Sequence, residues 1–165
     1  MAAAGWSIAF VSWIKTPITE KPSRFPVTRV KIPVPAIGTS FPRRARAYLR
    51  ATRALATAVT EERPDVIVAH DFEVLSAAVR AKRRTRAPVI YDSHEDWPAL
   101  IAENDPREAR LAALQERRLC GRVDQVVTVS DPIAAKFRKW GRPTSVLYSA
   151  RPRGEIHFAD RKSVV

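Results

Sequence analysis

The sequence predicts an α/β fold, a Rossmann-like three-layer sandwich around a mostly parallel sheet. Two observations predict it. Short runs that are apolar at almost every position recur along the chain, as in parallel strands that are buried on both faces. A longer segment with the period of an amphipathic helix follows most of these runs. Because crossovers between parallel strands are right-handed, we expect a doubly wound sheet with helices on both faces.

Composition restricts the class of protein. The chain has 165 residues, enough for one domain with a core. Cys120 is the single cysteine, which excludes an internal disulfide, and we expect it to be a small buried hydrophobe. The net charge of +12 favours polyanionic partners. Neither a secretory signal nor an apolar run long enough to cross a bilayer is present, so we expect a cytoplasmic protein.

The first part of the chain predicts two strands and a long helix. Residues 7–14 (SIAFVSWI) read as a buried strand, 15–23 as a proline-containing loop, and 27–34 as a half-exposed strand. From residue 40 to 63 the apolar spacing becomes helical, and Pro64 disfavours its continuation. The opposite helix face carries four arginines: Arg43, Arg46, Arg50 and Arg53.

The second part predicts four strands with helices between them. The strands are residues 65–70 (DVIVAH), 88–92 (PVIYD), 125–129 (QVVTV) and 144–148 (TSVLY). The helices are residues 73–84, 97–104, 106–122 and 130–140. In the first of these helices Leu75, Ala78 and Val79 are expected to face inward, and the third bears Leu111, Leu114 and Leu119.

Polar residues follow three of these strands. They are His70-Asp71, then Asp92-Ser93-His94-Glu95-Asp96, then Ser130-Asp131. Since ligands of open α/β sheets bind outside the carboxyl ends of the strands, we expect these groups to converge at one edge. The carboxylates around His94 should raise its pKa and orient one ring nitrogen.

Each group also has a structural interpretation. Ser130 or Asp131 can cap the next helix, whose N-terminus could equally attract phosphate. His70 can be a hydrogen-bonded residue at a strand end, and Asp71 a helix cap. The run from Asp92 to Asp96 can cap the helix that begins at residue 97.

Other chemistries are less well supported. Asp92, His94 and Glu95, together with His70, have side chains that a metal ion accepts, but no HExxH-type spacing accompanies them, so we expect no metal and no cofactor. No GxSxG elbow, phosphate-binding P-loop or GxGxxG turn is present.

Four segments between residues 63 and 152 carry a family resemblance. RPDVIVAHD, APVIYDSHED, RVDQVVTVSDPIAAKF and SVLYSARP, in this order, resemble the N-terminal domain of family 4 (group 1) glycosyltransferases of the GT-B fold. The resemblance implies retaining transfer of a sugar from a nucleotide-sugar to an acceptor, without an essential metal. It implies that His94 is the cleft histidine, flanked by Glu95 and Asp92, and that Ser130 opens the last helix of the domain.

We therefore expect His94 and Glu95 to be catalytic, and His70, Asp71, Asp92 and Ser130 to bind substrate. Residues 1–150 would be the acceptor-side domain, lacking its first βα unit, and 151–165 an interdomain connection. In the family a second domain binds the nucleotide-sugar, so we expect this chain to be inactive alone and completed by a donor domain in cis or in trans.

The arginine stripe allows two interpretations. It can be a solvated helix face, or it can dock on an anionic membrane that holds lipid-linked acceptors. A non-catalytic module that binds nucleic acid through its charge is the alternative to an enzyme. The basic residues are not interleaved with exposed aromatic residues, and no nucleic-acid motif is present, which disfavours that alternative.

Overall fold

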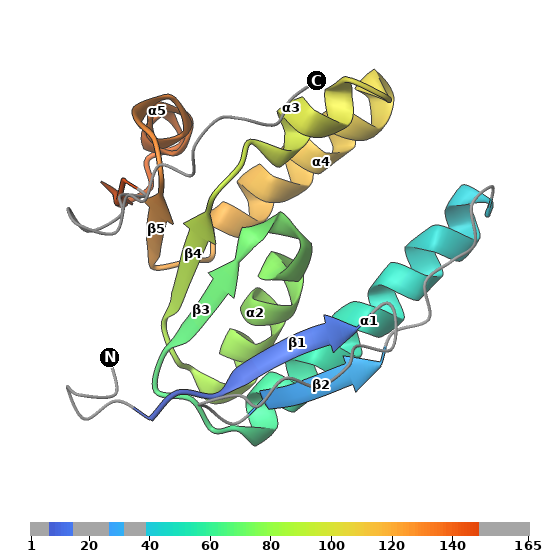
Figure 1. Ribbon diagram of the computed structural model, residues 1–165, viewed down its shortest axis with the longest axis vertical. Coiled ribbons are helices and arrows are strands. Elements are labelled where there is room, and N and C mark those ends of the chain that lie inside the picture. The colour runs from blue at the N-terminus through green and yellow to red at the C-terminus, as the bar shows by residue number, and fades with distance from the viewer. Residues whose placement is uncertain (1–6, 15–26, 32–38, 149–165) are drawn as a thin grey trace, which may run out of the picture.

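The computed structural model describes residues 7–14, 27–31 and 39–148 (Figure 1). The strands are β1 (Phe10–Ile14), β2 (Val27–Lys31), β3 (Ile67–His70), β4 (Val89–Ser93), β5 (Gln125–Thr128) and β6 (Thr144–Val146). The helices are α1 (Phe41–Glu61), α2 (Asp71–Thr85), α3 (Trp97–Ala102), α4 (Pro106–Cys120) and α5 (Asp131–Lys139). The predicted loop 15–23, the end of the predicted strand 27–34 and the tail 151–165 lie outside these residues.

All strand pairs in the described residues are parallel. β3, β4, β5 and β6 lie side by side in sequence order, and β1 pairs with β2 in a separate sheet. The arrows of β3, β4 and β5 point the same way in Figure 1. Helices α2, α4 and α5 connect successive strands of the larger sheet. The predicted Rossmann-like α/β fold with parallel strands is confirmed.

One face of the larger sheet carries the core. Alternate side chains of β3, β4 and β5 are buried, as the two-residue period of a strand requires. On this face the ring of Tyr91 packs edge-on against Phe137 of α5, with 5.7 Å between the ring centroids. Leu75 of α2 and Cys120 of α4 belong to the same cluster. Cys120 is thus the buried hydrophobe that its sequence context predicts.

The opposite face of the sheet is more exposed in the described part of the chain. Val68 of β3 is 50% exposed, and its neighbours Ile90 and Val127 on β4 and β5 are half-buried. The described residues therefore form the sheet and the layer of helices on one of its faces, which are two of the three layers of the expected sandwich. His70 and Asp92 share this more open face, because they alternate with the buried residues of their strands.

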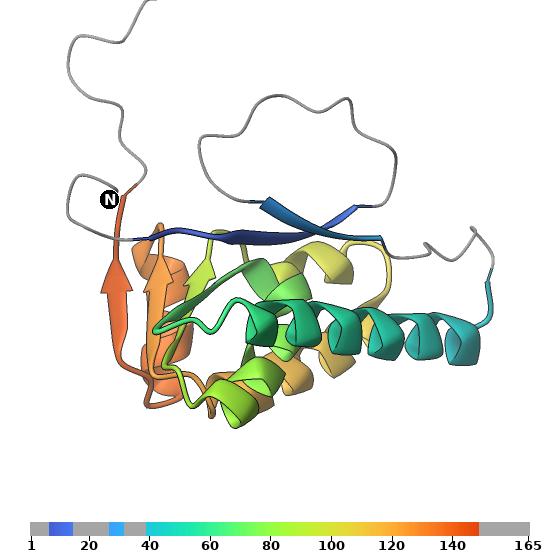
Figure 2. The same ribbon diagram turned by 90° about the horizontal axis from the view of Figure 1, so that it is seen from below.

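Helix α1 packs on α2 and on the β1–β2 pair, and Figure 2 shows α1 and α2 beneath these two strands. The hydroxyl of Tyr48 donates a hydrogen bond to Ser76 Oγ of α2 at 2.8 Å. Pro42 lies in the first turn of α1, where a missing N–H costs nothing. The four arginines of the predicted stripe are all exposed: Arg43, Arg46, Arg50 and Arg53.

The side of α4 that faces the core is not the side that carries Leu111 and Leu114. Leu111 and Leu114 are 55% and 62% exposed, and Leu119 is half-buried. The buried positions are instead Ala109, Ala112, Glu116 and Cys120. Three of these four side chains are small, whereas the large side chains of Leu111 and Leu114 face outward.

Candidate functional site

His70 and Asp92 form the base of the site. They are directly paired in register at the carboxyl ends of β3 and β4. His70 Nδ1 lies 2.8 Å from Asp92 Oδ2. The register of the neighbouring parallel strands places the two Cα positions side by side, and the side-chain rotamers complete the contact. We expected residues at the ends of these strands to converge, and these two side chains do.

His94 joins them from the loop after β4. Its Nε2 lies 3.0 Å from the same oxygen, Asp92 Oδ2. Its backbone N–H donates to Asp71 Oδ1 at 3.2 Å. The rings of His70 and His94 are 6.2 Å apart between centroids. One carboxylate oxygen therefore faces two imidazoles.

Asp71 has an unusual backbone conformation. Its φ of 63° lies in the left-handed region, which few non-glycine residues adopt and which aspartate tolerates better than most. Its carboxylate accepts a hydrogen bond from the backbone of His94, in the loop after β4. Asp71 thus holds the backbone that carries His94, in addition to opening α2. Such local strain is often found at functional sites.

The environment of His94 favours its protonated form. The hydrogen bond from the His94 ring to the Asp92 carboxylate raises the pKa of His94, and the charges of Asp92, Asp71 and Glu95 act in the same direction. Partial burial opposes this increase without cancelling it. The direction agrees with the prediction made from the surrounding carboxylates.

Glu95 and Ser130 follow β4 and β5 at the same edge, but their side chains form no hydrogen bond with His70 or His94. Glu95 is exposed, and its carbonyl accepts a hydrogen bond from Ser93 Oγ at 3.2 Å, which holds the turn. Ser130 occupies the N-cap position of α5, but its side chain makes no capping hydrogen bond. The position agrees with the capping interpretation, whereas the expected bond is not formed.

Comparison with known proteins identifies the family. A family model described as "Glycosyl transferase 4-like domain" matches residues 1–148. The chain belongs to this family. No curated protein matches the chain. The match includes the segments after residue 63 whose motifs resemble the family, and it also covers the first strands and α1.

In this glycosyltransferase 4-like domain, a network of charged side chains on the buried side of the sheet is connected to the candidate site. Glu116 of α4 is fully buried, and its two oxygens accept from Tyr91 Oη and Lys136 Nζ, each at 3.0 Å. Lys136 of α5 also donates to Asp96 Oδ1 at 3.0 Å. The network links α4, α5 and β4 to the loop of His94. Sequence reasoning missed Glu116 and Lys136, because charged residues in amphipathic helices usually face solvent.

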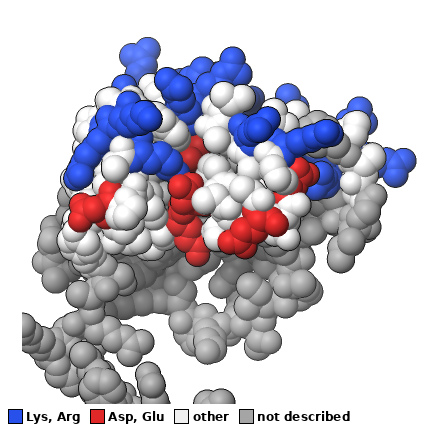
Figure 3. Space-filling view, turned by 90° about the horizontal axis from the view of Figure 1, so that it is seen from above, with Lys and Arg blue, Asp and Glu red and all other residues white. Residues whose placement is uncertain are grey.

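Acidic side chains gather at this end of the domain. Figure 3 views the end toward which β3, β4 and β5 point. Asp and Glu side chains form a band across the middle of the view, and Lys and Arg side chains cover much of its upper part from one side to the other. In a chain of net charge +12, the carboxylates of Asp71, Asp92 and Glu95 nevertheless surround His94.

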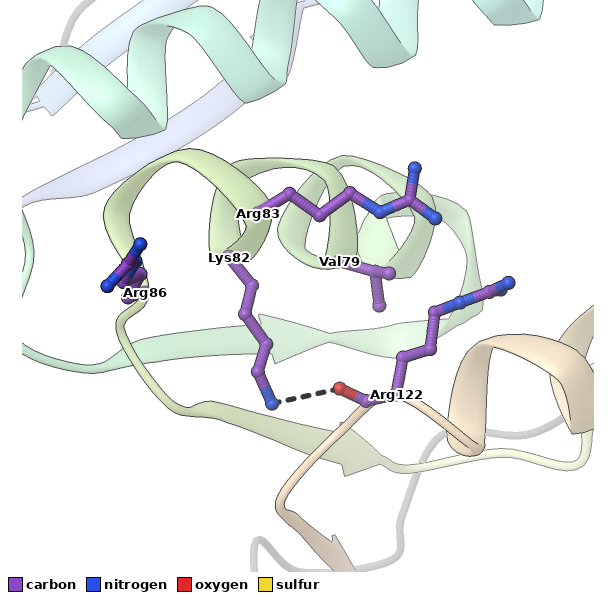
Figure 4. Close-up of a pocket in the computed structure, with 5 residues that line it drawn as sticks. All are labelled: Val79, Lys82, Arg83, Arg86 and Arg122. Atoms are coloured by element: carbon purple, nitrogen blue, oxygen red, sulfur yellow. Dashed lines mark hydrogen bonds between the residues drawn. The ribbon is translucent and has the colours of Figure 1, made fainter.

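A shallow basic pocket lies at the other end of the sheet. Its volume is about 440 Å³, and Val79, Lys82, Arg83, Arg86 and Arg122 line it (Figure 4). These residues precede β4 and β5, at the C-terminal ends of α2 and α4. Lys82 Nζ donates to the carbonyl of Arg122 at 3.0 Å, and basic residues are favourable at helix C-termini. The pocket is thus separate from the site of His94.

No helix in the described residues is long and apolar enough to span a bilayer.

Proposed function

We propose that this glycosyltransferase 4-like domain forms the acceptor side of a retaining glycosyltransferase that uses a nucleotide-sugar donor. The observation that carries the proposal is the convergence of His70, Asp71, Asp92 and His94 where β3 and β4 end. Ligands of α/β sheets bind at this edge. The family match supports transfer of a sugar as the chemistry.

In this proposal His94 lies beside the transferred sugar and the acceptor hydroxyl. Asp92 holds the Nε2 side of the ring, and Glu95 adds a second carboxylate next to it. His70 and Asp71 contact the substrate from the end of β3, and Ser130 from the start of α5. Alternating imidazoles and carboxylates suit sugar hydroxyls, which both donate and accept hydrogen bonds.

The nucleotide-sugar is bound by a second domain, which the same polypeptide or a separate protein supplies. Positive groups of that domain stabilise the leaving diphosphate. We further propose that residues 1–150 are the acceptor-side domain, and that the transfer needs no metal. The domain acts in the cytoplasm, and its arginine stripe adsorbs to anionic membranes.

The experiment that tests the proposal compares the chain alone with the chain completed by a donor-binding domain. The isolated chain should not turn over UDP- or GDP-sugars. In the completed enzyme, His94→Ala should reduce sugar transfer severely and leave nucleotide affinity nearly unchanged. His157→Ala, which removes another of the chain's 3 histidines, serves as control.

Two results would contradict the proposal. Turnover of a nucleotide-sugar by the purified chain would mean that it contains its own donor site. Loss of nucleotide affinity in His94→Ala, with transfer of the remaining bound donor intact, would place His94 on the donor side.

A further inference from the structure

The side chains at the end of β3 and β4 have the composition of a metal-binding site. His70 Nδ1, Asp92 Oδ2 and His94 Nε2 all lie within 4.8 Å of one another. Two imidazole nitrogens and one carboxylate oxygen suit Zn²⁺ and its neighbours in the first transition row. Zinc sites with an open position commonly use three protein ligands of these types. We propose that these three residues bind one Zn²⁺ ion.

The distances agree with this proposal. Zn–N and Zn–O bonds of about 2.0–2.2 Å place the ligand atoms of a tetrahedral site about 3.3 Å apart. The two nitrogens now lie 2.8 and 3.0 Å from Asp92 Oδ2. Each nitrogen therefore needs to move away from Asp92 Oδ2 by only about half an ångström or less. The two nitrogens lie within 4.8 Å of each other, and rotation of the exposed imidazole side chains brings them to the spacing that the ion requires.

The site combines a fixed backbone with accessible side chains. The β3–β4 register fixes His70 against Asp92, and the Asp71 carboxylate holds the backbone of His94. The side chains of His70 and His94 are 61% and 50% exposed, whereas Asp92 is only 17% exposed. The ion can thus enter from solvent and take water as its fourth ligand, while the protein fold stays as it is.

Binding the ion would exclude sugar transfer, a consequence that rests on the proposed function. The ring nitrogen of His94 that contacts Asp92 becomes a metal ligand, and the ion covers the edge where the sugar would lie. Zinc is therefore an inhibitor of the completed enzyme, while binding of zinc itself requires only the isolated chain.

Isothermal titration of the metal-free chain with zinc chloride tests the site directly. We expect one ion per chain, with shifts of the His70 and His94 ring signals in NMR spectra. His70→Gln, Asp92→Asn and His94→Gln should each weaken binding at least about tenfold, since even residues that only orient ligands contribute that much. Circular dichroism checks that each variant is folded.

Matched variants separate this site from general attraction of cations. Glu95→Gln removes a neighbouring carboxylate, and His157→Gln removes the remaining histidine. Both should bind zinc like the original chain. The absence of saturable binding, ligand variants that bind zinc as tightly as the original chain, or loss of binding in either control would overturn the proposal. If the chain binds zinc but the completed enzyme transfers no sugar even in the absence of zinc, the result counts against the proposed function alone.

Discussion

Burial has the largest effect on the chemistry of Cys120. Its side chain is fully buried at the end of α4. Burial raises the pKa of the Cys120 thiol to about 12, and the charge of Glu116 acts in the same direction. Because the thiolate is the nucleophile, the residue should be inert in the folded protein.

Thiol labelling should therefore report unfolding. We predict that Ellman's reagent does not modify the native chain at pH 8 on the timescale on which it modifies the chain in urea. The rate of modification gives the measurement. Rapid modification of the folded chain would show that the end of α4 opens readily.

The same burial makes stability depend on alkaline pH. The unfolded thiol ionises near its ordinary pKa of 9.0, and the folded thiol only near 12. The folded state then holds more protons, so the free energy of unfolding should fall as the pH rises between these values. Urea denaturation at several alkaline pH values measures the slope, which should be smaller in Cys120→Ala. Equal slopes would refute this explanation.

At the scale of the element, α4 depends on its first residues. Asp105 is the N-cap, and its Oδ1 accepts from the backbone N–H groups of Arg107 and Glu108 at 2.9 and 3.0 Å. These hydrogen bonds lower the pKa of Asp105. The stabilisation is thus present at neutral pH and is lost as the pH falls through the folded pKa, below 3.8.

Removing this cap should lower the thermal stability of the domain. We predict that Asp105→Ala lowers the melting temperature by a few degrees, whereas Asp105→Asn, an equally good N-cap, has a much smaller effect. Differential scanning calorimetry at neutral pH measures both. Equal losses in the two variants would mean that charge, rather than capping, matters.

The arginine stripe of α1 gives an element-scale prediction for membranes. Each basic residue near an anionic surface contributes about 1 kcal/mol. Changing Arg43, Arg46, Arg50 and Arg53 to Ser should therefore abolish sedimentation with vesicles that contain phosphatidylserine. Binding to neutral vesicles should be absent throughout, and salt should weaken the anionic binding.

The control removes the same charge from another helix. Arg107, Arg110, Arg117 and Arg118 are exposed on α4, and their replacement by Ser should reduce vesicle binding much less. Similar losses in both variants would assign the binding to net charge. Unchanged binding in the α1 variant would refute docking through the stripe.

Most elements of this fold could be predicted from the sequence. The apolar runs before His70 and Asp92 predicted β3 and β4 within two residues, because strands of a parallel sheet must be apolar on both sides. The orientation of α4 could not be predicted. Leu111 and Leu114 have helical spacing, but the face of α4 that is buried carries the small side chains of Ala109 and Ala112.

At the scale of the whole molecule, the Glu116–Lys136 pair connects the core to the candidate site. Burial raises the pKa of Glu116, while the charge of Lys136 lowers it. Lys136 also lies 4.7 Å from the centre of the Phe137 ring. Removing the lysine would leave a carboxylate buried without its cation, which typically costs about 3–5 kcal/mol.

We predict that Lys136→Met destabilises the domain by about 3 kcal/mol at neutral pH. The loss should shrink as the pH falls, because Glu116 is then protonated. Adding Glu116→Gln should recover part of the stability. Urea denaturation of the single and double variants measures these differences, and an equal loss at all pH values would contradict the explanation.

The candidate site was predictable where it depends on strand ends. His70, Asp92 and His94 were found because residues after parallel strands share an edge. Their common contact at one oxygen of Asp92 depends on side-chain rotamers, which sequence patterns do not specify. Lys136 and Glu116 come from separate helices, and only the three-dimensional packing brings them together.

The pairing of His70 with Asp92 in register also limits how this family can change in length. Inserting or deleting one residue within β3 or β4 would turn one of the two side chains toward the helices. Between the strands, α2 and its flanking turns can vary in length without moving either residue. Natural variants should therefore accept insertions around residues 83–87 and exclude them from the two strands.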